Sequence, residues 1–189
     1  MKSGKGRGKI PDWLRNAREH WEYNGDRRPA FDVEPKEGQR SVWDFPRPPM
    51  IEKVSKPITV SHQGQSITNT RDALAVLETA SPPTYYIPVK DIDMGMLVEI
   101  PGKTSMCEWK GRAVYWALKD EPVLPVAWSY PDPFAMFKVL KNHLAFYPQL
   151  LDCRVDGIRV EPQPGKFYAG WITPDLVGPF KGEPGTGHW

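Results

Sequence analysis

Apolar and polar residues alternate over several short stretches of this chain, and that pattern predicts a mainly β structure. The alternation is clearest at residues 58–70, around the sequence HQGQ, where it indicates a β-hairpin. A second hairpin is predicted at residues 154–160, with Asp156 and Gly157 as its turn. Further strands are predicted at residues 84–87, 105–109, 112–118 and 123–130.

Three other segments have apolar residues at helical spacing. A short amphipathic helix is predicted at residues 12–23, and a second helix at residues 71–79, with Thr70 as its N-cap. A third is predicted over residues 132–147, beginning at Asp132. Strands do not alternate with long helices, so a doubly wound parallel sheet is not expected. The fold class expected is mainly β with two or three helices and antiparallel sheets.

The chain of 189 residues has the length of one domain with N- and C-terminal extensions. Residues 1–40 combine a basic, Gly-rich tail, which we expect to be disordered, with the short helix and a polar linker. Residues 41–160 would form the folded core. Residues 161–189 are rich in aromatic residues, Gly and Pro without periodicity, which is typical of an arm that packs on the core, here through rings such as Phe167 and Trp171.

The composition argues against several classes of protein. The formal net charge is only +2, and the basic tail at residues 1–9 accounts for more than all of it, so nucleic-acid binding is not expected. The chain has no apolar run of about eighteen residues and no secretory signal, which argues against a membrane protein and for a cytoplasmic one. Cys107 and Cys153 are too few for a disulfide scaffold or a zinc site, so we expect no metal and no cofactor.

Three segments are unusually dense in rings and charges, and they supply the candidate binding residues. The first is SVWDFPRPP, which would display Trp43 and Arg47 on a stiff extended strand. Two interpretations of Arg47 are open. It either binds an anionic ligand, or it lies in a clamp and pairs with a carboxylate of the protein.

The second segment is CEWKGRAVYW. Its alternation places Cys107 and Trp109 on one face and Lys110 on the other, with Tyr115 further along. One interpretation is a core strand with an inert thiol. The other is the mouth of an aromatic pocket, where a neighbouring lysine would activate the thiol by lowering its pKa.

The third segment is AWSYPDP, where Trp128 and Tyr130 share one face of a strand and either stack on a ligand or fill the core. Between these segments, Glu78 falls at the end of the predicted second helix. A carboxylate faces the unfavourable end of the helix dipole there, so an ion pair would be needed. The candidate partners are Arg47, Arg71 and Lys110.

Five sequence blocks, read in order, resemble the domain-of-unknown-function 427 family. They are Trp43 to Pro49, Leu77 to Pro88, Cys107 to Trp116, Ala127 to Pro133 and Ala145 to Pro148. The closing segment from Phe167 to Gly182 is similar to the long bacterial form of that family. The resemblance implies a β-tent, Mss4-like fold, and the family sometimes carries a nucleotidyltransferase-like label. This sequence has no Gly-Ser followed by Asp-x-Asp to support that label, and no Cys-x-x-Cys pairs for the zinc of β-tent relatives.

Together these observations predict a soluble protein that binds a small molecule in an aromatic cleft containing a few charged groups. The predicted ligand-binding residues are Trp43, Arg47, Arg71, Tyr85, Tyr86, Trp109, Tyr115, Trp128 and Tyr130. If the protein is an enzyme, Glu78 or Asp91 would be the acid or base, Lys110 or Arg47 would stabilise charge, and Cys107 would be the nucleophile. The alternative is a protein-interaction or self-association module, for example a homodimer, built from the two terminal arms.

Overall fold

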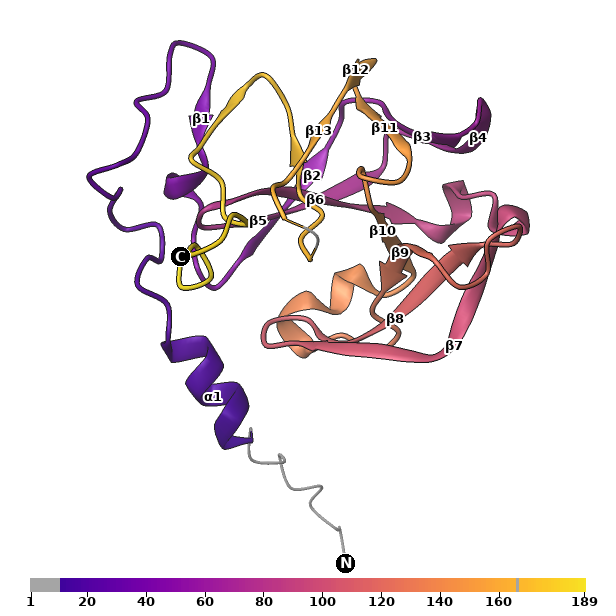
Figure 1. Cartoon of the computed structure of the whole chain (residues 1–189), viewed down its shortest axis with the longest axis horizontal. Coiled ribbons are helices and arrows are strands. Elements are labelled where there is room, and N and C mark those ends of the chain that lie inside the picture. The colour runs from indigo at the N-terminus through magenta and orange to yellow at the C-terminus, as the bar shows by residue number, and fades with distance from the viewer. Residues whose placement is uncertain (1–10, 166) are drawn as a thin grey trace, which may run out of the picture.

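The computed structural model describes residues 11–165 and 167–189, and its β-strands dominate the molecule (Figure 1). The largest sheet has seven strands, all paired antiparallel. Across the sheet they are β2 (Met50–Val54), β5 (Ala73–Glu78), β6 (Ser81–Pro88), β10 (His143–Phe146), β9 (Pro125–Ser129), β8 (Gly111–Leu118) and β7 (Leu97–Cys107). The prediction of a mainly β fold with antiparallel sheets is confirmed.

A second antiparallel sheet and two strand pairs complete the β structure. The four-stranded sheet contains, in order, β12 (Ile158–Arg159), β11 (Asp152–Val155), β3 (Ile58–His62) and β4 (Gln65–Thr70). The two pairs are β1 (Arg40–Ser41) with β15 (Leu176–Val177), which run parallel, and β13 (Glu161–Pro162) with β14 (Trp171–Ile172). Both predicted hairpins are therefore confirmed, as β3–β4 and β11–β12.

The helices are short. The only α-helix in the described part of the chain is α1 (Asp12–Glu19), which projects away from the sheets in Figure 1. It confirms the predicted first helix but ends before Trp21. Leu14 is the buried residue of this helix, and Trp13 is 52% exposed. The other helical elements are the 3₁₀ turns η1 (Val42–Asp44), η2 (Val89–Asp91), η3 (Met94–Met96) and η4 (Ala135–Leu140).

The helix predicted at residues 71–79 is wrong, because this segment forms β5. Strand β5 lies between β2 and β6, and both of its faces are covered. A strand buried on both sides needs a continuous apolar run, which spacing alone cannot distinguish from a buried helix. Thr70 is accordingly not an N-cap. It ends β4, and its hydroxyl donates to the Asp91 carboxylate at 2.6 Å.

The long helix predicted at residues 132–147 is also wrong. Asp132 is not its N-cap, because the 3₁₀ turn η4 begins only at Ala135. Asn142 then adopts φ +63°, a left-handed conformation that no helix can continue through. The following residues enter the middle of the large sheet as β10, between β6 and β9. The apolar residues assigned to a helix face are those of a turn followed by a buried strand.

The core lies on both faces of the seven-stranded sheet. On one face, Trp43, Phe146 and Trp171 are fully buried. On the other face a smaller cluster contains Tyr86 and Phe137. Because side chains of a strand alternate between faces, Tyr85 and Tyr86 on β6 enter different clusters.

The C-terminal segment packs against the first of these faces and lies beside the N-terminal segment, where β15 pairs with β1 (Figure 1). Trp171 confirms the predicted arm contact, since its indole nitrogen donates to the Phe146 carbonyl at 3.1 Å. Phe167 contradicts it, being 75% exposed. The predicted disordered tail at residues 1–9 lies outside the described residues. The division of the chain at residues 41 and 160 stays a prediction.

In the described part of the chain, no helix is long and apolar enough to cross a membrane.

Candidate functional site

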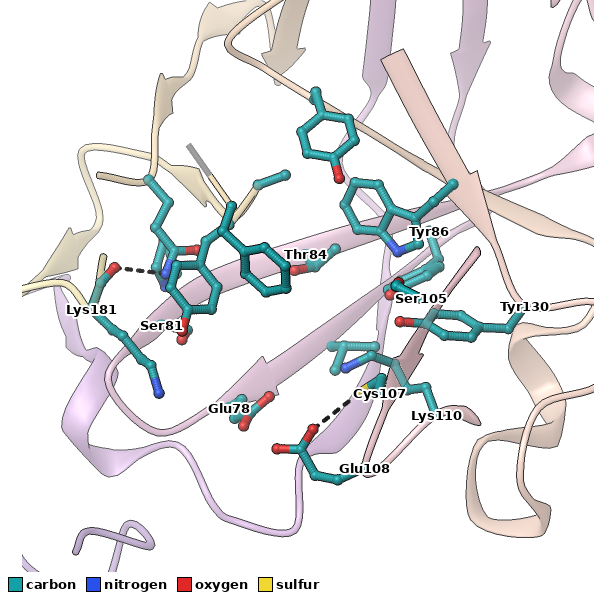
Figure 2. A pocket seen from close by; sticks show the side chains of 18 of the residues that line it. Glu78, Ser81, Thr84, Tyr86, Ser105, Cys107, Glu108, Lys110, Tyr130 and Lys181 are labelled. Carbon is teal, nitrogen blue, oxygen red and sulfur yellow. Dashed lines mark hydrogen bonds between the residues drawn. The ribbon is translucent and has the colours of Figure 1, made fainter. Parts of the chain in front are cut away.

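A cavity of about 330 Å³ opens on the face of the large sheet that carries the smaller cluster (Figure 2). Its aromatic lining comes from Trp21, Tyr86, Tyr115, Trp128, Tyr130, Tyr147, Phe167 and Tyr168. Its charged lining comes from Glu78, Glu108, Lys110 and Lys181. Strands of the sheet form one wall, and segments from both ends of the chain form the remainder.

Strand register explains why the rings gather on one face. Ala145 on β10 pairs with Tyr86 on β6 and with Trp128 on β9, and Trp128 pairs in turn with Tyr115 on β8. These four residues therefore form one row across four neighbouring strands. Because Ala145 is small, the rings of Tyr86 and Trp128 meet across it, with centroids 6.3 Å apart and planes nearly perpendicular.

Lys110 enters the cavity from the tight turn between β7 and β8. Gly111, at φ +101°, closes this turn, and the Lys110 carbonyl accepts a hydrogen bond from the Phe134 amide at 3.1 Å. Only 9% of Lys110 is exposed, and within the described residues its ammonium makes no ion pair or hydrogen bond. Burial alone would lower the pKa of Lys110. Attraction to the ionised forms of the acidic groups around it, foremost Cys107 and Tyr86 and then Glu78 and Glu108, outweighs burial and raises that pKa above its usual value.

Two donors that line the cavity are buried without a hydrogen-bond partner among the described residues. They are the hydroxyl of Tyr86 and the indole nitrogen of Trp21. Each such group costs about 1–3 kcal/mol when it is left unsatisfied. Burial also raises the pKa of Tyr86 to about 12, so its hydroxyl is a proton donor at neutral pH.

The Arg47 side chain does not line the cavity, but it pairs at 3.2 Å with Glu78, which does. Its other guanidinium nitrogens donate to the carbonyls of Tyr23 and Thr79, at 2.8 and 3.0 Å. It also stacks on Trp21, with 4.1 Å between the guanidinium carbon and the ring centroid. Of the two interpretations of Arg47, the contacts support the clamp. The ion pair expected for Glu78 is confirmed, although Glu78 ends a strand and not a helix.

Lys181 is a cavity residue that the sequence did not indicate. Its ammonium lies 3.8 Å from the Trp21 ring centroid and donates to the main-chain oxygen of Trp189 at 2.8 Å. Burial lowers the pKa of Lys181 to about 8, and the nearby Arg47 cation adds to the effect. It comes from a C-terminal segment with no periodicity, so no pattern could have found it. By contrast, Thr84 and Ser105 also line the cavity, and strand alternation could have indicated them.

The structure places seven of the predicted site residues around the cavity. They are Glu78, Tyr86, Cys107, Lys110, Tyr115, Trp128 and Tyr130. The Cys107 thiol donates to Glu108 across 3.7 Å. The catalytic and binding roles assigned to these residues stay predictions, but their side chains do converge on one space.

Two predicted ligand-binding residues lie on the opposite face of the sheet. Trp43 is fully buried among the rings of Tyr23, Phe31 and Trp189, with centroids 5.2 to 5.4 Å away. Tyr85 packs on Trp171 at 5.0 Å. Both are core residues, and neither lines the cavity.

Three further predicted residues also lie outside the cavity. Asp91 is bound by the Thr70 hydroxyl and pairs with Lys90 at 3.2 Å, so its carboxylate is occupied beside η2. Arg71 is exposed and reaches a backbone carbonyl of the β2–β3 loop. Trp109 is buried in the smaller cluster, with the Arg18 guanidinium 5.4 Å from its ring centroid.

Nowhere in residues 11–165 or 167–189 do three His, Cys, Asp or Glu side chains come together in a way that could hold a metal ion.

One family profile matches this chain, at residues 50–161, and its description is "Domain of unknown function (DUF427)". The match covers more than half of the chain and runs from β2 to the first residue of β13, so it includes both larger sheets. Among curated proteins, none matches. Trp21, Tyr168 and Lys181 line the cavity but lie outside the matched region. The cavity is therefore built partly from the shared sheets and partly from the two terminal segments.

Proposed function

Because this chain belongs to the DUF427 family, whose description names no activity, we propose its function from the cavity alone: it binds a small, partly aromatic organic molecule there. The cavity has the volume of a small-molecule site, for which about 300 Å³ is the lower end of the usual range. Its walls are mainly rings, interrupted by a few charged and hydroxyl groups. Rings stack on flat apolar ligands, while a small number of polar groups fix the ligand's orientation.

The observation that carries the proposal is the pair of unpartnered donors, Tyr86 Oη and Trp21 Nε1. Buried polar groups in folded proteins nearly always have partners, and the exceptions call for an explanation. The residues that carry these groups both line one cavity, although Tyr86 comes from the sheet and Trp21 from the N-terminal segment. A ligand with acceptor atoms would satisfy both.

The test is a thermal-shift screen of the full chain against four groups of compounds: aromatic acids, aromatic amides, nucleobases and aliphatic compounds of similar size. A ligand at one hundred times its Kd adds about 2.7 kcal/mol to the free energy of unfolding. For a chain of this length that raises Tm by roughly 5–10 °C. We expect ring-containing compounds to raise Tm and aliphatic ones not to.

Two tryptophan variants locate the binding site. Trp128→Ala removes a cavity ring that packs on Tyr147 at 4.8 Å, and it should abolish the shift. Trp13→Ala removes an exposed ring on α1 and should leave the shift intact. The proposal fails if no ring compound raises Tm, or if a shift survives Trp128→Ala unchanged.

The alternative, an interaction module built from the arms, stays a prediction, as do enzymatic turnover and a cytoplasmic location. One observation favours ligand binding over that alternative. The N-terminal segment supplies Trp21 and the C-terminal segment supplies Lys181, and both side chains face the cavity of their own chain. The arms therefore have a role within the site without any partner.

A further inference from the structure

We infer that Lys110, Tyr86 and Tyr130 form a head-group site that binds the carboxylate of an aromatic monocarboxylic acid. This inference rests on the proposed function, because it specifies which end of the ligand enters first and what charge that end carries. It goes further because it assigns three residues to the binding of the ligand's carboxylate.

The three side chains reach the same end of the cavity from different elements. Tyr86 comes from β6, Tyr130 follows β9 directly, and Lys110 lies in the β7–β8 turn. The rings of Tyr86 and Tyr130 have centroids 6.3 Å apart, and Figure 2 shows both of them close to Lys110. Each of the three residues is nine-tenths buried or more. A strand, a strand end and a tight turn hold them, so the site is rigid before any ligand arrives.

Two of these residues, Lys110 and Tyr86, present donors without acceptors. The Lys110 ammonium has no carboxylate within 4.0 Å among the described residues, and the Tyr86 hydroxyl has no hydrogen-bond partner there. Burial raises the pKa of Tyr86 to about 12 and that of Tyr130 well above its usual value, so both phenols keep their protons at neutral pH. A buried cation without a counter-ion destabilises the fold, because it has lost its hydration without gaining a partner. An anion placed among the three groups would remove that cost and satisfy the orphaned hydroxyl.

The other charges of the cavity limit the anion to a single negative charge. The Glu78 carboxylate is neutralised by Arg47, but Glu108 also lines the cavity and pairs with no cation among the described residues. A phosphate dianion would be repelled by Glu108. The second lysine of the cavity, Lys181, has a pKa lowered to about 8 and donates to the main-chain oxygen of Trp189, so Lys110 would have to supply most of the balancing charge. Dianions are usually held by Arg forks or by backbone amides at a helix N-terminus. The Arg47 fork is already occupied by Glu78 and two carbonyls.

The apolar part of the acid would lie along the row of rings that continues from Tyr86. Trp128 and Tyr115 follow it across the sheet, and Tyr147 packs against Trp128. Ser105 holds the Tyr115 hydroxyl at 2.7 Å, which fixes that ring in place. A ring attached to the carboxylate directly, or through one or two methylenes, would stack on this row.

The test compares three matched probes by isothermal titration calorimetry on the full chain: phenylpropionate, its amide, and phenyl phosphate. The wild type should bind phenylpropionate at least tenfold more tightly than either of the others. Hydrogen bonds and ion pairs to charged groups are worth roughly a ten- to hundredfold change in affinity when one partner is removed. Lys110→Met should therefore lower the affinity for phenylpropionate by that factor and leave the affinity for the amide unchanged. Tyr86→Phe removes only the unpartnered hydroxyl and should weaken the acid about tenfold.

A control and distinct outcomes separate this inference from the proposed function. Lys138→Met removes an exposed cation on η4 and should change nothing. If the wild type binds the amide as well as the acid, or if Lys110→Met binds the acid unchanged, the head-group assignment is overturned while ring binding stands. If phenyl phosphate binds most tightly, the limit to one charge is wrong. If none of the probes binds, the head-group assignment is overturned, and the thermal-shift screen of ring compounds decides the proposed function separately. Should Lys110→Met not fold, Tyr86→Phe carries the test alone.

Discussion

Arg47 connects the N-terminal segment to the sheet beneath the cavity, and replacing it should cost more than any exposed ion pair. Its side chain is 2% exposed, and that of Glu78 is 21% exposed. Arg47→Met keeps an unbranched apolar stem but removes the guanidinium, and with it the stacking on Trp21. It removes the ion pair and both hydrogen bonds to the carbonyls of Tyr23 and Thr79. The Glu78 carboxylate then stands without its cation.

The magnitude follows from burial. Removing one partner of a fully buried ion pair costs about 3–5 kcal/mol, and Glu78 retains some access to solvent through the cavity, so we take the low end. We expect Arg47→Met to lower the free energy of unfolding by about 3 kcal/mol, and Tm by roughly 6–12 °C for this length. Glu78→Gln leaves Arg47 its two carbonyls and should cost about 1 kcal/mol.

The assay is urea denaturation of the wild type, both single variants and the double variant. The coupling energy between Arg47 and Glu78 should be about 1–2 kcal/mol, within the range for contacting residues. Lys56→Met is the matched control, because Lys56 and Asp175 form an exposed pair at 3.5 Å. It should cost less than about 1 kcal/mol. The reasoning would be refuted if Arg47→Met lowered the free energy of unfolding by no more than Lys56→Met does, at an unchanged m-value.

Three further predictions concern single groups. Cys107 faces the cavity, whereas Cys153 is buried and has a raised pKa. A thiol reagent should therefore modify only Cys107 in the folded protein and both cysteines after unfolding. Mass spectrometry that finds Cys153 labelled in the folded protein would contradict this. The pKa of Lys181 falls from 10.5 to about 8 on folding, so the unfolded chain binds more protons between those values and stability rises with pH there. Lys181→Met should abolish that rise in urea midpoints measured at pH 7.5 and pH 10, and an equal rise in the variant would refute it. Trp171→Phe loses the hydrogen bond to Phe146 and leaves a void, so it should lower the free energy of unfolding by about 2 kcal/mol in the same assay. A loss below about 0.5 kcal/mol would contradict this prediction.

Sequence reasoning succeeded where apolar and polar residues alternate and failed for two of the strands inside the large sheet, β5 and β10. Hairpin β3–β4 was predictable, because its apolar residues alternate with polar ones. The segments that form β5 and β10 lie inside the seven-stranded sheet, where both faces are covered and alternation disappears. Their helical spacing arose because a short run of apolar residues fits several periods equally well. Only pairing with neighbouring strands, which no local pattern contains, decides between strand and helix.

The same reasoning explains which cavity residues could be predicted. Trp128 and Tyr130 occupy alternate positions of one predicted strand, so their common face was predictable. That Tyr115, on another strand, shares this face follows only from the pairing of β8 with β9. Whether that face was core or cavity was not, because the answer depends on which residues lie opposite. Lys181 had no signal, since a segment without periodicity places its side chains through contacts with the remainder of the fold.

The terminal segments make this face of the sheet a cavity and determine its chemistry. The matched family region alone contains Lys110, Glu78 and the row of rings, all on one face of a sheet. Without Trp21 and Lys181 covering it, that face would be open to water, which would hydrate the Lys110 ammonium and the Tyr86 hydroxyl. A solvated ammonium attracts an anion only weakly, because the attraction falls as the dielectric constant rises. The proposed discrimination between a carboxylic acid and its amide would therefore depend on the terminal segments as much as on the head-group residues.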